Sequence, residues 1–233
     1  MKTKLLITLF ISIIATQMSF AHALWIETSS NGSLNKKHTV KVFYGEYAEQ
    51  AIDPVDKWYS DVKDFDLYLI SPSGTKTKLD KKSNIDHFES EFIPSENGTY
   101  TLSIVHGAKE PYETMRFEFS SVAFVTVGKG QATSTKAPFH LKPNNSNPKV
   151  GNDLEISVLN DGLGQKETEV IIMGPEGWTK TVHSDENGKI SFKPLAVGKY
   201  IIEASKTEDK AEEWDGKKIE KIWRGSTLAI QVK

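Results

Sequence analysis

The sequence predicts an all-β protein in which two tandem β-sandwich domains follow a cleaved signal peptide. Three observations lead to this prediction: short strand-like segments separated by turns, a motif that recurs 100 residues later, and an apolar run at the N-terminus. The chain has 233 residues, which is enough for one large domain or for two domains of about 100 residues each.

Short segments rich in β-branched and aromatic residues dominate the chain after residue 38. Apolar and polar residues alternate most clearly in Tyr100–Val105 and Leu228–Val232, as they do in a half-buried strand. Helical periodicity is nearly absent, and a short helical stretch is expected only at Thr207–Trp214. The expected strands are Val40–Tyr44, Phe65–Ile70, Tyr100–Val105, Val122–Val127, Leu154–Leu159, Val170–Met173 and Leu228–Val232.

The two halves of the chain share a pattern. Phe92–Tyr100 and Phe192–Tyr200 both read F-x-P-x-x-x-G-x-Y, at a separation of 100 residues. Upstream, Pro72-Ser73-Gly74 is echoed by Pro175-Glu176-Gly177. Because a Pro-Gly hairpin and a Gly-x-Tyr corner occur twice in the same order, we expect two sandwich domains of related topology.

The domain boundary is expected in the segment Gly128–Gly151, which is rich in Gly, Pro and Asn and has little periodicity. We place the N-terminal domain at residues 22–130 and the C-terminal domain at residues 131–233. The proline content of this segment predicts limited freedom between the domains.

Residues 1–21 are expected to be a signal peptide. Lys2 and Lys4 form a basic start, and Leu5–Thr16 is an apolar run too short to span a membrane. Ser19-Phe20-Ala21 supplies a small-x-small cleavage pattern, and Ala21-His22-Ala23 supplies a second one. Cleavage after Ala21 makes His22 the first residue of the mature protein, whereas cleavage after Ala23 removes it.

Composition narrows the class of protein. The 29 Lys and Arg against 31 Asp and Glu give a net charge of −2, which argues against a nucleic-acid partner. The chain contains no Cys, so disulfides, thiol catalysis and a lipid-anchored N-terminal Cys are excluded. We expect an exported, periplasmic protein that is soluble and not lipid-anchored.

A histidine at the mature N-terminus has distinctive chemistry. Its α-amine and ring Nδ1 can chelate one metal ion together, and such an amine has a pKa of about 7.7. His22 is therefore a candidate ligand for Ni, Co or Cu, with His106 or Glu46 closing the site. His106 follows the strand Tyr100–Val105, and Glu46 lies just after Val40–Tyr44. The alternative is that these three residues are ordinary surface side chains.

Catalytic motifs are absent from the sequence. It has no G-x-S-x-G elbow, no H-E-x-x-H, no P-loop and no G-x-G-x-x-G. A copper oxidase with an N-terminal histidine brace needs a second brace histidine, which the sequence does not establish. We therefore expect a protein that is not an enzyme.

Three segments resemble a known family. His22–Glu27 follows the signal peptide and leads to Val42–Glu46; Gly174–Trp178 continues through Ser184–Phe192; and Gly198–Ala204 is followed by Trp223–Leu228. Together they resemble the NikM-like family of exported proteins, a domain of unknown function linked to nickel and cobalt uptake. The second segment also resembles transthyretin-like sandwiches. The resemblance implies immunoglobulin-like or transthyretin-like domains and favours cleavage after Ala21.

The function expected from these observations is capture or delivery of a divalent transition-metal ion for uptake, through the N-terminal His22. The ion is Ni or Co, with Cu as the next candidate, and the expected partner is an inner-membrane metal transporter or an outer-membrane receptor. The alternative is a non-catalytic adhesive or scaffold protein that binds a transporter, receptor or glycan.

Overall fold

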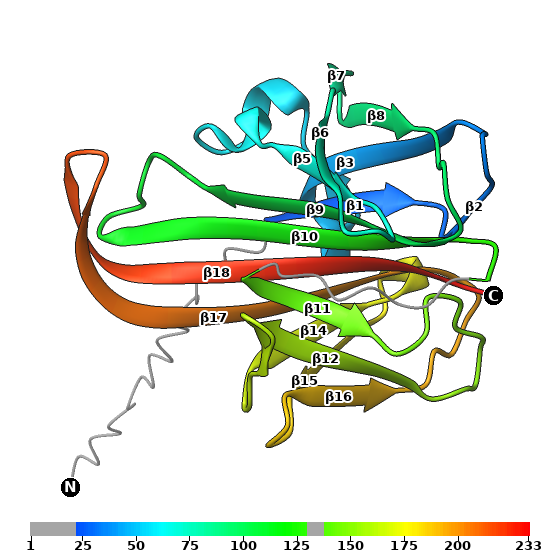
Figure 1. The fold of residues 1–233 in the computed structure, drawn as a ribbon. Helices are drawn as coiled ribbons and strands as arrows, with labels where there is room; N and C mark the ends of the chain where they lie inside the picture. Colours follow the sequence, from blue (N-terminus) through cyan, green and yellow to red (C-terminus); the bar gives the residue numbers. More distant parts are fainter. Residues whose placement is uncertain (1–21, 130–137) are drawn as a thin grey trace, which may run out of the picture.

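The computed structural model describes residues 22–129 and 138–233, which form three β-sheets (Figure 1). The predicted signal peptide and the predicted boundary between residues 130 and 131 lie outside these residues. The strands of the central sheet are β2 (Asn31–Gly32), β5 (Leu67–Ile70), β6 (Lys76–Leu79), β9 (Gly98–Gly107), β10 (Met115–Val127), β14 (Glu169–Met173), β15 (Thr179–His183), β17 (Gly198–Trp214) and β18 (Lys217–Val232). Their order is β15–β14–β17–β18–β10–β9–β5–β6, with β2 paired to β10. The predicted all-β class is confirmed.

Two smaller sheets flank the central one, the first above β10 and the other below β18 in Figure 1. The first contains β1 (Ala23–Thr28), β3 (His38–Glu46), β4 (Ala51–Ile52), β7 (Lys82–Ser83) and β8 (Phe88–Phe92). The other contains β11 (Phe139–Pro143), β12 (Leu154–Asn160), β13 (Leu163–Gly164) and β16 (Lys189–Phe192). Short 3₁₀ turns lie at Tyr47–Glu49, Val55–Lys57, Val62–Asp64 and Pro175–Gly177.

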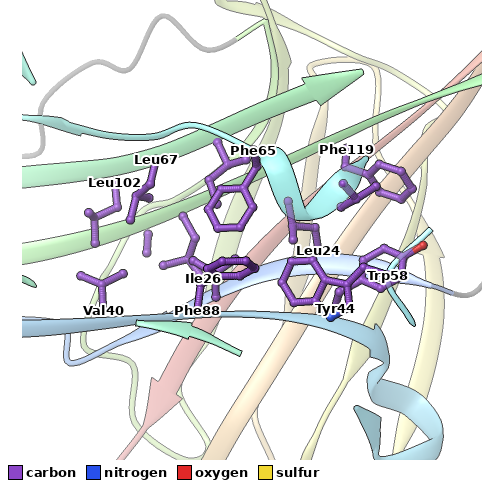
Figure 2. Close-up of a cluster of buried hydrophobic side chains, with 14 of the residues drawn as sticks. Leu24, Ile26, Val40, Tyr44, Trp58, Phe65, Leu67, Phe88, Leu102 and Phe119 are labelled. Atoms are coloured by element: carbon purple, nitrogen blue, oxygen red, sulfur yellow. The ribbon is translucent and has the colours of Figure 1, made fainter. Parts of the chain in front are cut away.

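A hydrophobic cluster lies on each face of the central sheet. In β10, Ala123 and Val125 face the N-terminal cluster, whereas Val122 and Phe124 face the C-terminal one, as expected for the alternating side chains of a strand. Figure 2 shows the N-terminal cluster, in which Leu24, Tyr44, Trp58 and Phe119 gather at one end.

The central sheet joins the two halves of the chain. Met115–Val122 of β10 pairs in parallel with Lys221–Leu228 of β18, whereas most other neighbouring strands are antiparallel. The sheet therefore runs without interruption from the strands of the N-terminal half to those of the C-terminal half.

The sequence repeat corresponds to the same local structure in both halves. The Tyr100 hydroxyl accepts hydrogen bonds from the backbone N–H groups of Ser95 and Glu96, each at 3.0 Å, and donates to the Glu96 carbonyl at 3.2 Å. The Tyr200 hydroxyl accepts from the Ala196 N–H and donates to the Ala196 carbonyl, both at 3.2 Å. Each tyrosine therefore ties its strand to the loop that precedes it.

The glycines of the repeat are required by close packing. Gly98 and Gly198 have φ of +137° and +144°. A Cβ added to Gly98 would lie 2.5 Å from Pro72, and one added to Gly198 would lie 2.6 Å from Pro175. The two Pro-Gly elements noted in the sequence thus pack against the two Gly-x-Tyr elements.

The expected short helix at Thr207–Trp214 is wrong. These residues belong to β17, which forms a long hairpin with β18. Asp215 and Gly216 connect the strands with φ of +47° and +76°, the conformation that favours an Asp-Gly hairpin. The indole N–H of Trp214 donates to the Ala108 carbonyl at 2.9 Å, so the hairpin is also held by the segment that follows β9.

The tyrosine hydroxyls are predicted to stabilise both halves. Tyr100→Phe leaves the part-buried N–H groups of Ser95 and Glu96 without their acceptor, and Tyr200→Phe leaves that of Ala196 without its acceptor, so each variant should lower the free energy of unfolding by about 0.5–1.5 kcal/mol per lost hydrogen bond, Tyr100→Phe by more. Urea denaturation measures this, with the part-exposed Tyr68→Phe as the control. A loss no larger than that of Tyr68→Phe would contradict the prediction.

Glu203 is a carboxyl group buried in the central sheet. It is 7% exposed and lies between Ile171 of β14 and Thr227 of β18. Burial, with a contribution from the Glu169 carboxylate, raises the pKa of Glu203 from 4.5 to about 8. The folded protein therefore holds a proton on Glu203 at neutral pH.

This proton predicts a pH dependence of stability. Between pH 4.5 and about pH 8 the unfolded chain has released the proton and the folded protein has not, so the free energy of unfolding falls as pH rises, by at most about 1.4 kcal/mol per pH unit. Glu203→Gln removes the titrating group and with it this pH dependence. The free energy of unfolding of the variant, relative to that of the parent, should therefore be higher at pH 8 than at pH 5. Urea denaturation at both pH values measures this difference, with the exposed Glu186→Gln as the control. The same difference between variant and parent at pH 5 and pH 8 would argue against the raised pKa.

Candidate functional site

The site begins where β1 enters the fold. Leu24 and Ile26 pack in the N-terminal cluster, and Trp25 packs on the opposite side of β1 with Phe43 and Ile201. β1 pairs antiparallel with β3, with Ala23 opposite Gly45. Continuing this register by one residue brings His22 opposite Glu46.

A chain of buried hydrogen bonds fixes β1 against the central sheet. The backbone N–H of Ile26 donates to the Ser121 hydroxyl at 3.0 Å, and the Thr227 hydroxyl donates to the Leu24 carbonyl at 2.7 Å. The two hydroxyls are 2.8 Å apart. These bonds satisfy two backbone groups, the Ile26 N–H and the Leu24 carbonyl, on the side of β1 that faces away from β3.

The imidazole of His22 lies between two carboxylates. Its Nδ1 is 3.7 Å from Oε1 of Glu46, and its Nε2 is 3.3 Å from Oδ2 of Asp53. The ring also lies beside that of Tyr44, with the ring centroids 5.5 Å apart. His22 is 45% exposed, so an ion can reach it from solvent.

Gly45 allows Asp53 to reach this place. β4 folds back onto β3 so that Gly45 pairs with Ile52, and the Asp53 N–H donates to the Tyr44 carbonyl at 3.0 Å. A Cβ on Gly45, whose φ is +150°, would lie 2.3 Å from the Ala51 carbonyl oxygen. Only glycine therefore permits so tight a return of the chain.

A cavity of about 220 Å³ opens beside His22. Its walls are mainly aromatic, and the residues that line it are His22, Tyr44, Asp53, Lys57, Tyr59, Phe117, Phe119 and Trp223. Burial, helped by the Asp53 carboxylate, raises the pKa of Tyr44 well above its usual range. The Tyr44 side chain is 3% exposed, and its hydroxyl forms no hydrogen bond with any residue that the structure describes.

Of the three predicted site residues, the structure brings His22 and Glu46 together but not His106. His106 Nε2 lies 3.2 Å from Oδ1 of Asp61, which also accepts the Lys109 N–H at 2.9 Å. Burial alone would raise the pKa of Asp61, but the Lys109 N–H and the His106 ring outweigh it and lower the pKa. His106 thus lies in a separate ion pair. Within residues 22–129 and 138–233, no group of three or more His, Asp or Glu side chains has the spacing of a metal site.

Sequence reasoning missed Asp53 and Tyr44. Asp53 reaches His22 only because the chain reverses at β4, a two-residue strand without a strong sequence signal. Tyr44 falls in a predicted strand, where burial is the ordinary expectation. The aromatic walls of the cavity come from strands distant in sequence, which no local pattern connects.

A family model described as a domain of unknown function (DUF4198) matches residues 19–208. No curated protein matches the chain. None of the helical segments in the described ranges is long and apolar enough to cross a membrane.

Solved structures show distant similarity. A DUF4785 family protein from Legionella pneumophila is 13% identical with a TM-score of 0.33, over 84% of this chain and 54% of that one. Salmonella alpha-2-macroglobulin is 10% identical with a TM-score of 0.29, and the match covers 91% of this chain and 15% of that one. A two-domain fibronectin type III segment of chicken tenascin is 13% identical with a TM-score of 0.26, and the match covers 88% of this chain and 97% of that one. The chain thus spans about half of the first protein and less than a sixth of the second.

The hydrogen bonds that hold β1 are predicted to contribute to the stability of the protein. Thr227→Val keeps the shape of the side chain but leaves the Leu24 carbonyl without its donor, so the free energy of unfolding should fall by about 1–3 kcal/mol. The exposed Thr179→Val is the matched control, and urea denaturation measures both. Equal stabilities of the two variants would show that β1 does not depend on this bond.

Proposed function

We propose that this chain, which belongs to the DUF4198 family, is an exported, periplasmic protein that captures or delivers a divalent transition-metal ion for uptake. The ion would be Ni or Co, with Cu as the next candidate, and the protein would exchange it with an inner-membrane transporter or an outer-membrane receptor. The observation that supports this proposal is the placement of the His22 ring between Glu46 and Asp53 at the mouth of a cavity.

The separation of the His22 and Glu46 donors suits a shared ion. With metal–nitrogen and metal–oxygen bonds of about 2.1 Å, donors that are 3.7 Å apart subtend an angle of about 120° at the metal. In the square-planar or tetragonal geometry of Ni²⁺ and Cu²⁺, neighbouring donors at 90° would be about 3.0 Å apart, so the two atoms must approach each other by about 0.7 Å for one ion to contact both. Glu46 is 22% exposed, so its carboxylate loses little hydration when it binds.

Asp53 orients the ring for this role. A carboxylate 3.3 Å from Nε2 favours a proton on that nitrogen, which leaves the lone pair of Nδ1 for a metal. Histidines that bind metals commonly donate their second ring N–H to a carboxylate in this way.

The α-amine supplies a further donor. His22 Nδ1 and Glu46 provide two, and a chain that begins at His22 adds its amine next to Nδ1 in one chelate ring. We therefore also propose that residues 1–21 are a signal peptide cleaved after Ala21. The repeated tyrosine corners support the finer proposal of two tandem immunoglobulin-like or transthyretin-like domains.

A comparison of three chains tests the proposal: one that begins at His22, one with a single Gly added before His22, and His22→Ala. Native mass spectrometry and calorimetry with Ni²⁺, Co²⁺ and Cu²⁺ should show one ion on the first. The added Gly removes the amine from the chelate ring, and His22→Ala removes Nδ1, so both should weaken binding by at least about 100-fold. Asp53→Asn should weaken metal binding by about 10- to 100-fold, because Asp53 orients the His22 ring. The exposed Asp56→Asn should leave binding unchanged.

Binding should also weaken as pH falls below about 7, because the ion must displace a proton from the amine. A chain that begins at His22 and remains free of all three metals would refute the proposal. The adhesive or scaffold alternative would then be favoured.

A further inference from the structure

We propose that the cavity beside His22 binds a small chelator that carries a carboxylate, so that the protein takes the metal as a complex with this organic ligand rather than as a bare ion. This inference rests on the proposed function. It follows from the number of donors that the site offers, the size and walls of the cavity, and the polar groups within it.

The donors near His22 leave coordination positions open. The α-amine, Nδ1 and Glu46 provide three donors, while Asp53 faces Nε2 on the other side of the ring. Ni²⁺ and Cu²⁺ in sites of nitrogen and oxygen ligands adopt square-planar or tetragonal geometries with at least four donors. At least one further donor must therefore come from outside the side chains named.

The cavity has room for the molecule that supplies it. A cavity of about 150 Å³ lined by apolar side chains holds benzene, and the cavity beside His22 measures about 220 Å³. Phe117, Phe119 and Trp223 form walls that suit a flat or apolar group. A ligand of one ring with a short polar arm therefore fits in contact with His22.

Two groups in the cavity suit a carboxylate. The Tyr44 hydroxyl belongs to a residue that lines the cavity and has no hydrogen-bond partner among the described residues, so an oxygen of the ligand can accept a hydrogen bond from it. The Lys57 ammonium is exposed at the same cavity, and its nearest carboxylate, that of Asp56, is 3.9 Å away. A ligand carboxylate can therefore accept hydrogen bonds from both Tyr44 and Lys57.

L-Histidine is a suitable probe, because it combines a flat ring, nitrogen donors and a carboxylate. Equilibrium dialysis of isotope-labelled L-histidine against the chain that begins at His22, with and without one equivalent of Ni²⁺, measures its retention. We expect retention with Ni²⁺ that is at least about tenfold above that without it. Native mass spectrometry should show one protein, one Ni²⁺ and one histidine in the same complex.

Two variants locate the bound histidine. Tyr44→Phe removes a hydroxyl without a protein partner, so the fold should be kept while retention with Ni²⁺ falls by about tenfold. Lys57→Gln should lower retention by a similar factor. The controls are Tyr68→Phe and Lys63→Gln, which alter a tyrosine and a lysine that do not line the cavity.

The outcomes separate this inference from the proposed function. If Ni²⁺ binds but histidine is not retained, or if Tyr44→Phe and Lys57→Gln retain it as well as their controls do, the inference is overturned and the proposed function stands. Equal retention with and without Ni²⁺ also overturns it. If the chain binds no Ni²⁺ even without histidine, the proposed function fails and this inference fails with it.

Discussion

The position of β1 depends on the hydrogen bonds that Ser121 and Thr227 make with its backbone. β1 pairs with β3 on one side only, so the N–H of Ile26 and the carbonyl of Leu24 on its other side would be buried without partners. Such groups cost about 1–3 kcal/mol each when unpaired. Because Ser121 lies on β10 and Thr227 on β18, the start of the N-terminal half is held by residues from both halves of the chain.

The same pairing of β10 with β18 assembles the cavity. Its parallel register places Phe117 opposite Trp223, and both side chains line the cavity with Tyr44 of β3. The rings of Phe117 and Trp223 meet edge to face, with centroids 5.8 Å apart. The cavity therefore requires a strand from each half, and a fragment that ends before β18 would lack one of its walls.

The sequence predicted the features that local patterns encode. Short runs of β-branched and aromatic residues predicted the strands from Val40–Tyr44 to Leu228–Val232, and each lies wholly or mostly within a strand of the structure. The sequence did not predict the parallel pairing of β10 with β18. This pairing joins segments more than 100 residues apart, and no local pattern in either segment indicates it. Thr207–Trp214 was predicted wrongly because its charged residues suit a helix surface as well as a solvated hairpin, and the Asp-Gly turn after it was the better signal. For the site, the position of His22 and Glu46 at the ends of neighbouring strands was accessible from sequence, whereas Asp53 was not.

The hydroxyl groups that stabilise the fold and the hydroxyl group at the cavity differ in their hydrogen-bond partners. The hydroxyls of Tyr100, Tyr200 and Thr227 are all satisfied by backbone groups: the two tyrosines bond to the loops just before their strands, and Thr227 bonds to β1, far away in the sequence. The Tyr44 hydroxyl has no such partner among the described residues, although its ring packs in the same core as Tyr100. A phenylalanine at this position would fill the core equally well, so the packing of the core does not require the hydroxyl. Tyr44 lines the cavity, where a ligand oxygen would supply the hydrogen-bond partner that the described residues do not.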